Sequence, residues 1–90
     1  MGYLNFSQKG DAWVSEEFIV NGDFNLHVER KGKGQFNLMQ KTAGSKFAEV
    51  REAEPFSNNE VIDIDVQVLI SKTFKVISYS EVTDAYYSEQ

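Results

Sequence analysis

Two runs of alternating apolar and polar residues, separated by a short glycine-containing segment, constrain this chain more than any other feature. The runs are Phe24–Arg30 and Gln35–Gln40, with Lys31–Gly34 between them. Because successive side chains of a strand point to opposite faces, each run places its apolar residues on one side. Two glycines among the four intervening residues can supply the positive φ angles of a tight reversal. The pattern therefore predicts a β-hairpin with one apolar and one polar face.

Further segments of the chain are rich in β-branched and aromatic residues, the composition typical of strands. Residues 61–70 alternate most regularly, and residues 52–59, which include the single proline, form the longest connection. Short strands at this spacing indicate a sandwich or barrel. We predict an all-β fold, an antiparallel β-sandwich of six or seven strands with an Ig-like or jelly-roll topology. Beyond the hairpin, strands are expected at residues 12–20, 47–51, 61–70, 73–79 and 82–87.

A single domain covering residues 1–90 is expected. The chain is 41% hydrophobic and contains seven Phe, four Tyr and one Trp, which is enough apolar surface for one core. It contains no cysteine, so apolar packing or association between copies must supply the stability. The residues that share the inward face of the predicted strands form the expected core: Phe18, Phe24, Leu26, Val28, Phe36, Leu38, Ile62, Ile64, Val66, Phe74 and Val76.

Residues 1–10 are interpreted as a possible arm. Tyr3, Leu4 and Phe6 are too apolar for a free tail. The arm is therefore expected to lie either on a sheet of its own domain or on a neighbouring subunit. The same segment lacks a basic leader followed by an apolar stretch, so no signal peptide is expected.

The charge distribution predicts protein partners. A net charge of −5 argues against nucleic acid and against an anionic membrane surface. Residues 1–46 hold six basic and five acidic residues, whereas residues 47–90 hold three basic and nine acidic ones. Such a polarised chain can dock head to tail on its own copies, and the alternative is an acidic surface that maintains solubility.

Residue patterns that would indicate catalysis or a cofactor are weak. Asp63 and Asp65 lie two positions apart on one strand face, which suits a calcium site or a solvated surface. His27 is the only histidine and lies on the polar face of its strand, and there is no cysteine to activate. We therefore expect no enzyme activity, no cofactor and no resident metal. A carbohydrate- or calcium-binding module, with Trp13 or the Tyr86–Tyr87 pair as a sugar platform, is the alternative function.

The stretch from Phe18 to Val50 resembles an element of small β-sandwich proteins in tailed bacteriophages. In those proteins an apolar-x-apolar-x-Arg strand, here Leu26–Arg30, precedes a glycine-containing reversal and a closing aromatic-x-x-Val, here Phe47–Val50. Lys31–Gly34 stands where related sequences often carry an acidic turn. The resemblance implies a structural virion protein, synthesised in the host cytoplasm, and gives no catalytic residues to carry over.

The expected function is that of a non-enzymatic structural module, a small capsid-decoration, fibre or tail component. It would act as a homo-oligomer and would contact a larger virion protein, without nucleic acid or membrane insertion. The basic residues at the predicted hairpin tip are expected to contact Glu52 and Glu54 of a neighbouring copy, or another acidic surface. The candidate interface residues are Tyr3, Leu4, Phe6, Arg30, Lys31, Lys33, Tyr86 and Tyr87.

Overall fold

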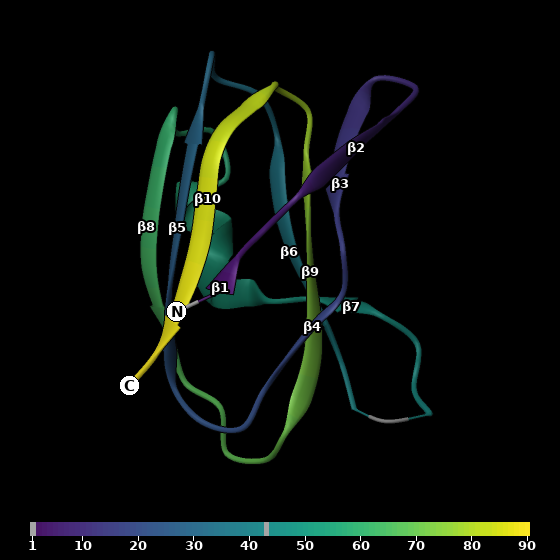
Figure 1. Cartoon of the computed structure of the whole chain (residues 1–90), viewed down its shortest axis with the longest axis vertical. Helices are drawn as coiled ribbons and strands as arrows, with labels where there is room; N and C mark the ends of the chain where they lie inside the picture. The colour runs from purple at the N-terminus through teal and green to yellow at the C-terminus, as the bar shows by residue number, and fades with distance from the viewer. Residues whose placement is uncertain (1, 43) are drawn as a thin grey trace.

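The structure, a computed structural model, describes residues 2–42 and 44–90. These residues form ten β-strands and one short 3-10 helix, arranged as two antiparallel sheets packed face to face (Figure 1). The predicted all-β sandwich is therefore confirmed. Within the described ranges, no helix has the length and apolar character needed to cross a membrane. The elements are β1 (Gly2–Tyr3), β2 (Phe6–Lys9), β3 (Ala12–Ser15), β4 (Phe18–Val20), β5 (Phe24–Arg30), β6 (Phe36–Lys41), β7 (Ala48–Glu49), η1 (Arg51–Phe56), β8 (Val61–Val66), β9 (Lys72–Ser78) and β10 (Val82–Glu89).

Most connections between consecutive strands pass from one sheet to the other. Sheet A has the strand order β1-β10-β5-β8. Sheet B has the order β2-β3-β9-β6-β7, with β4 also paired to β9. As a result, β5 in sheet A and β9 in sheet B each lie between strands that are distant in the sequence.

The core lies between the two sheets and contains the residues that the alternating patterns select. Every residue of the predicted core is buried, and the aromatic rings of Phe18, Phe24 and Phe74 contact one another at its centre. Pairs of rings at such separations add stability beyond the area they bury. The structure adds further apolar residues to this core: Leu4, Val20, Val50, Ala53, Val68 and Ala85.

The predicted hairpin is wrong in its pairing, although both of its strands exist. β5 pairs with β8 and β10 in sheet A, whereas β6 pairs with β7 and β9 in sheet B. The segment between them is an arch that carries the chain across one end of the sandwich. Alternation determines which face of a strand is buried, and two apolar faces are buried equally well by facing each other across a sandwich.

The glycines of this arch do not have the positive φ angles that the hairpin interpretation required. Among the described residues, only Gly10 and Gly44 have positive φ, at 62° and 82°. Gly34 instead permits close packing, because a Cβ there would lie 2.8 Å from the carbonyl oxygen of Tyr79. A tight two-residue hairpin turn does occur, at Gly10 between β2 and β3.

Two segments of residues 2–10 pair with strands of the sheets. β1 pairs with β10, and β2 pairs with β3. The side chain of Leu4 is buried, and its backbone N–H donates to the carbonyl oxygen of Ala85 at 3.0 Å. Phe6 packs against the core from its edge. The segment therefore lies on its own domain, as far as the structure describes it, since Met1 lies outside the described residues.

The number of strands exceeds the predicted six or seven for two reasons. β1 and β2 come from the expected arm, and the predicted strand at residues 12–20 is divided into β3 and β4. The division falls at Glu16 and Glu17. Next to it, the backbone N–H of Val76 in β9 donates to the side-chain Oγ of Ser15 at 2.8 Å and not to a backbone carbonyl. Boundaries elsewhere also differ, because the predicted strand 61–70 ends at Val66 and η1 occupies most of the predicted connection 52–59.

Candidate functional site

The outer surface of sheet A collects most of the polar side chains of β5 and β8. β5 is paired on both sides, so its outward residues form the central column of this surface. Each of them has a cross-strand neighbour on β8 and another on β10. We call this surface the acidic face, and its residues are Tyr3, Asn25, His27, Glu29, Val61, Asp63, Asp65, Asp84, Tyr86 and Ser88.

His27 lies at the centre of the acidic face between two carboxylates. Its Nε2 is 2.9 Å from Oε2 of Glu29, and its Nδ1 is 2.9 Å from Oδ2 of Asp63. The hydrogen bonds to Glu29 and then to Asp63 raise the pKa of His27 above its ordinary value of 6.5. A neutral imidazole has one ring proton and can donate to only one of the two carboxylates. The arrangement therefore suits the protonated imidazolium, which donates to both.

Asp63 and Asp65 are joined by the side-chain amide of Asn25. Nδ2 of Asn25 donates to Oδ1 of Asp63 at 2.8 Å and to Oδ1 of Asp65 at 3.2 Å. The bond from Asn25, followed by that from His27, lowers the pKa of Asp63. Because an N–H donor lies between the carboxylates, this geometry does not support the calcium alternative. Within the described residues, no group of three or more His, Cys, Asp and Glu side chains could hold a metal ion.

The two tyrosines proposed as a sugar platform point in opposite directions. Tyr86 belongs to the acidic face, where its ring stacks on the imidazole of His27 with centroids 4.9 Å apart. Tyr87 points inward and stacks on Phe18 with centroids 4.6 Å apart. Neighbouring residues of a strand cannot share a face, so the Tyr86–Tyr87 pair does not form one platform.

A second candidate site is a groove of about 440 Å³ at one edge of the sandwich. We call it the edge groove. It lies where the segment that joins β1 to β2 passes from sheet A to sheet B (Figure 1). Three aromatic residues line it, and the remaining lining comes from that segment and from the start of β10. The full lining is Tyr3, Leu4, Asn5, Phe6, Trp13, Glu81, Val82, Thr83, Asp84 and Ala85.

Hydrogen bonds to both sheets hold the wall of the edge groove in place. On the side of sheet A, the N–H of Leu4 donates to Ala85. On the side of sheet B, the backbone N–H of Asn5 donates to Oε1 of Glu16 at 3.1 Å, and the backbone N–H of Glu16 donates to the carbonyl oxygen of Asn5. The groove is therefore a preformed feature of the fold, as ligand and partner sites commonly are.

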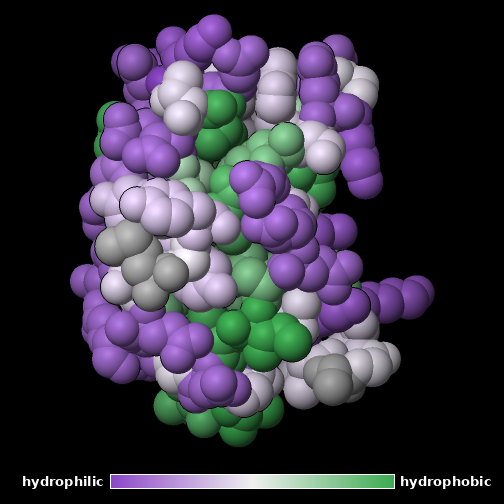
Figure 2. Space-filling model, viewed as in Figure 1, coloured by the Kyte–Doolittle hydropathy of each residue, from purple (hydrophilic) through white to green (hydrophobic). Residues whose placement is uncertain are grey.

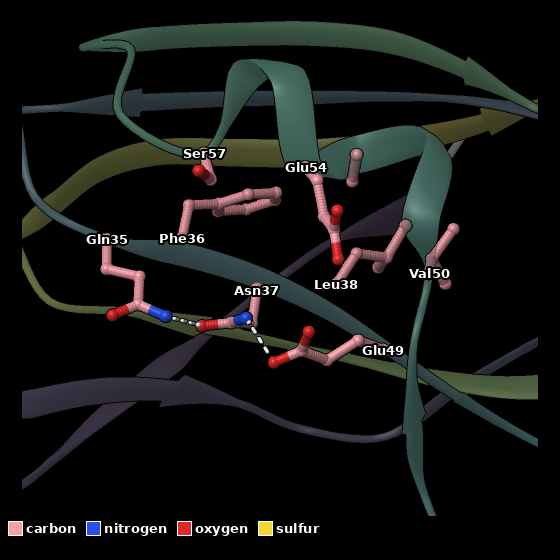
Figure 3. Close-up of a pocket in the computed structure, with 9 residues that line it drawn as sticks. Gln35, Phe36, Asn37, Leu38, Glu49, Val50, Glu54 and Ser57 are labelled. Carbon is pink, nitrogen blue, oxygen red and sulfur yellow. Dashed lines mark hydrogen bonds between the residues drawn. The ribbon is translucent and has the colours of Figure 1, made fainter.

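A pocket of about 350 Å³ lies near the opposite edge, between β6 and η1 (Figure 3). Nε2 of Gln35 donates to Oδ1 of Asn37 at 3.3 Å, and Nδ2 of Asn37 donates to Oε1 of Glu49 at 2.8 Å. Figure 3 shows the side chain of Glu54 pointing into the pocket from η1. The rim is therefore polar and acidic, whereas Phe36 and its apolar neighbours form the interior.

Arg30, predicted at an exposed tip, is buried with 3% of its surface exposed. Its Nη1 donates to the carbonyl oxygen of Gly34 at 2.7 Å and to Oγ of Ser78 at 3.3 Å, and its Nη2 donates to the carbonyl oxygen of Asn59. Burial lowers the pKa of this guanidinium group. The expectation that Arg30 faces an acidic partner is therefore wrong, because the side chain points between the sheets and joins three segments there.

The other predicted interface residues divide between the surface and the interior. Lys31 forms an ion pair with Glu81 of the same chain, with 2.6 Å between Nζ and Oε2. Lys33 and Tyr3 are exposed, whereas Leu4 is buried. Contact of the two lysines with Glu52 and Glu54 of a neighbouring copy stays a prediction.

Comparison with protein-family models, curated proteins and solved structures finds no match for this chain. The case for a function therefore depends on the geometry of the acidic face, the edge groove and the exposed surface.

The sequence did not predict the cluster of His27 with its two carboxylates, nor the group of residues that lines the edge groove. Glu29 lies two positions from His27, so the alternating pattern already placed both on one face. The pairing of His27 with Asp63 required the β5–β8 register, which no local pattern supplies. The position of Trp13 in a groove likewise depends on where the β1–β2 segment crosses the sandwich.

Proposed function

We propose that the protein is a non-enzymatic assembly module that works through contacts with copies of itself and with a larger protein. The observation that supports this most directly is the exposure of large apolar side chains. Leu69 is 94% exposed and its neighbour Ile70 is 57% exposed. Figure 2 shows hydrophobic surface at the lower end of the molecule, where Figure 1 places the β8–β9 connection. Contiguous exposed apolar surface, where it is large, marks protein–protein contact sites, and these two neighbouring side chains are the start of such a surface.

The outer surfaces of the two sheets support contacts between unlike surfaces. The acidic face carries Glu29, Asp63, Asp65 and Asp84. The outer surface of sheet B instead carries apolar side chains together with lysines, namely Val14, Ile19, Met39, Lys41, Lys75 and Ile77. Two acidic faces repel each other, so copies are expected to meet through different surfaces.

The setting we propose is a tailed-phage virion, in which the module would decorate a shell or form part of a fibre or tail. This part of the proposal depends on the resemblance of residues 18–50 alone. The two lysines at the arch, Lys31 and Lys33, would then contribute salt-sensitive contacts at the rim of an interface.

Sedimentation velocity at increasing protein concentration tests the proposal. Association of copies, or binding to a virion protein, is expected in the micromolar range and should weaken with salt. A protein that stays monomeric at several hundred micromolar, and that binds no virion protein, would contradict the proposal.

A carbohydrate-binding module is the second candidate, favoured by the composition of the edge groove. Trp13, Tyr3 and Phe6 lie there beside Asn5 and Asp84, which combines aromatic rings with amide and carboxylate groups. Trp13 is the only tryptophan, so a panel of oligosaccharides can be titrated against its fluorescence. A change with one sugar that is lost in Trp13→Phe would support this candidate, and no change with any sugar would remove it.

A further inference from the structure

We propose that the β8–β9 loop of one copy inserts Leu69 and Ile70 into the edge groove of the next copy, so that copies assemble head to tail. This inference rests on the proposed function and names the contact that it uses. We call Leu69 and Ile70 the knob. Large exposed apolar residues that occur singly are ordinary on protein surfaces, so the argument depends on how the knob is held and on where its counterpart lies.

The knob is held on both sides by hydrogen bonds to the β4–β5 connection. Before it, the N–H of Val68 donates to Oδ1 of Asp23 at 2.8 Å, and the Val68 side chain is buried. After it, Oγ of Ser71 donates to Oδ1 of Asn21 at 2.6 Å. The loop therefore presents its two apolar side chains to solvent in a fixed position, which reduces the entropy that a partner would have to remove on binding.

The edge groove has the chemistry that an aliphatic knob requires. Phe6, Trp13 and Val82 give it apolar walls, and Tyr3 is 68% exposed at its mouth. Aromatic residues of this kind are the commonest strong contributors to protein interfaces. The edge groove also has polar lining residues, but a larger share of its surface is apolar than in the pocket under η1, which is therefore the weaker match.

The charges around the knob and the groove are complementary. Lys72, two residues after Ile70, lines a shallow hollow together with Lys46 and with Lys41, which is paired with Glu17. The lining of the edge groove instead includes Asp84 together with Glu81, which is paired with Lys31 of its own chain. An approach of the basic end of one copy to the acidic edge of another is therefore electrostatically favourable, and it should weaken as salt screens these charges.

The positions of the two surfaces exclude a contact within one chain, so the complementary charges point to a second copy as the occupant. The knob lies at the lower end of the long axis, whereas the start of β10, which lines the groove, lies at the upper end (Figure 1). Because the molecule is about 33 Å long, the knob cannot reach the groove of its own chain. A contact between two different surfaces of identical copies repeats without closing on itself unless the rotation happens to form a ring.

The test is complementation between two variants of the full chain. Leu69→Ser with Ile70→Ser removes the knob, and Thr83→Arg blocks the groove. Each variant alone should self-associate at least about tenfold more weakly than the wild-type chain in sedimentation velocity, which corresponds to about 1.4 kcal/mol of association free energy. An equimolar mixture should form dimers and nothing larger, because one knob and one groove remain intact in each pair.

Matched controls separate this contact from general effects on the surface. Phe56→Ser with Tyr79→Ser removes two other exposed apolar side chains, and Ser57→Arg places the same bulk in the pocket under η1. Both controls should assemble like the wild-type chain. Melting temperatures show whether each variant is folded, and Asn5→Arg replaces Thr83→Arg if the latter does not fold.

Three outcomes would overturn the inference: a monomeric wild-type chain, a knob variant that assembles as the wild-type chain does, or a mixture without dimers. In the second case the proposed function would stand, because copies would still associate by another surface. A monomeric chain that binds a virion protein would likewise leave the proposed function intact.

Discussion

Replacing Arg30 with methionine tests whether a buried cation holds the arch end of the sandwich together. Its guanidinium donates to the carbonyl oxygens of Gly34 and Asn59 and, over longer distances, to Gln35 and Ser78. Methionine fills much of the same space but donates to none of these oxygens. The substitution therefore separates hydrogen bonding from packing.

The expected cost follows from these contacts. Hydrogen bonds that involve a charged group contribute about 1.5–3 kcal/mol each, and the guanidinium of Arg30 donates to four oxygens here. Part of this loss is offset, because the substitution also removes the cost of burying a cation. That cost includes the buried Nε of Arg30, which has no hydrogen-bond partner among the described residues. We therefore expect Arg30→Met to lower the free energy of unfolding by about 2–4 kcal/mol, a large part of the total for a domain of this size.

Urea unfolding followed by tryptophan fluorescence measures the loss as a lower midpoint at an unchanged slope. Lys33→Met is the matched control, because Lys33 is exposed in the same arch, and it should change the free energy by less than about 0.5 kcal/mol. If Arg30→Met stays within about 1 kcal/mol of the wild-type chain, the guanidinium does not stabilise the arch and the reasoning fails.

Three further predictions use the same unfolding assay. Leu26→Ala should cost about 2–5 kcal/mol because the side chain is fully buried, and a cost below about 1 kcal/mol would contradict the β5 register. Gly34→Ala should destabilise the protein because the new Cβ would lie 2.8 Å from the backbone of Tyr79. Gly32→Ala should be tolerated because its Cβ would have its nearest neighbour at 3.5 Å. Equal effects of the two substitutions would refute this account. The folded state raises the pKa of His27 above 6.5, so the stabilisation that His27 contributes should be complete below pH 6.5 and be lost as the pH rises through the pKa of the folded state. His27→Gln should therefore make the free energy of unfolding less dependent on pH. An unchanged pH profile in this variant would contradict the role assigned to the two carboxylates.

The sequence predicted which face of each strand is buried better than it predicted which strands pair with one another. The positions of Phe24, Leu26 and Val28 follow from alternation alone, and all three are buried. Their pairing does not follow, because an apolar face can be covered by an adjacent strand or by the opposite sheet. The alternation that placed Val28 inside also applies to Arg30, two positions further on, yet its charge suggested a solvent-exposed tip. Here the strand periodicity was the better guide.

The candidate sites depended on contacts between distant parts of the chain. The acidic face could be anticipated in part, since His27 and Asp63 were each placed on an outward face. Their meeting required the pairing of β5 with β8, and the edge groove required the crossing of the β1–β2 segment. Such contacts are specified by the packing of the whole domain rather than by any local pattern.

The arches that join the two sheets also limit the order in which the chain can fold. β5 and β6 are adjacent in sequence, but β5 gains both of its sheet partners from β8 and β10, and β6 gains its longer pairing from β9, all of which follow much later. The hairpin formed by β2 and β3 and the short pairing of β6 with β7 are the local exceptions. Contacts of such long range slow folding to about the millisecond-to-second scale typical of all-β domains. On the ribosome, the apolar faces of β5 and β6 would therefore stay uncovered until the last strands emerge, so this is the interval in which the nascent chain is most open to aggregation or to capture by a chaperone.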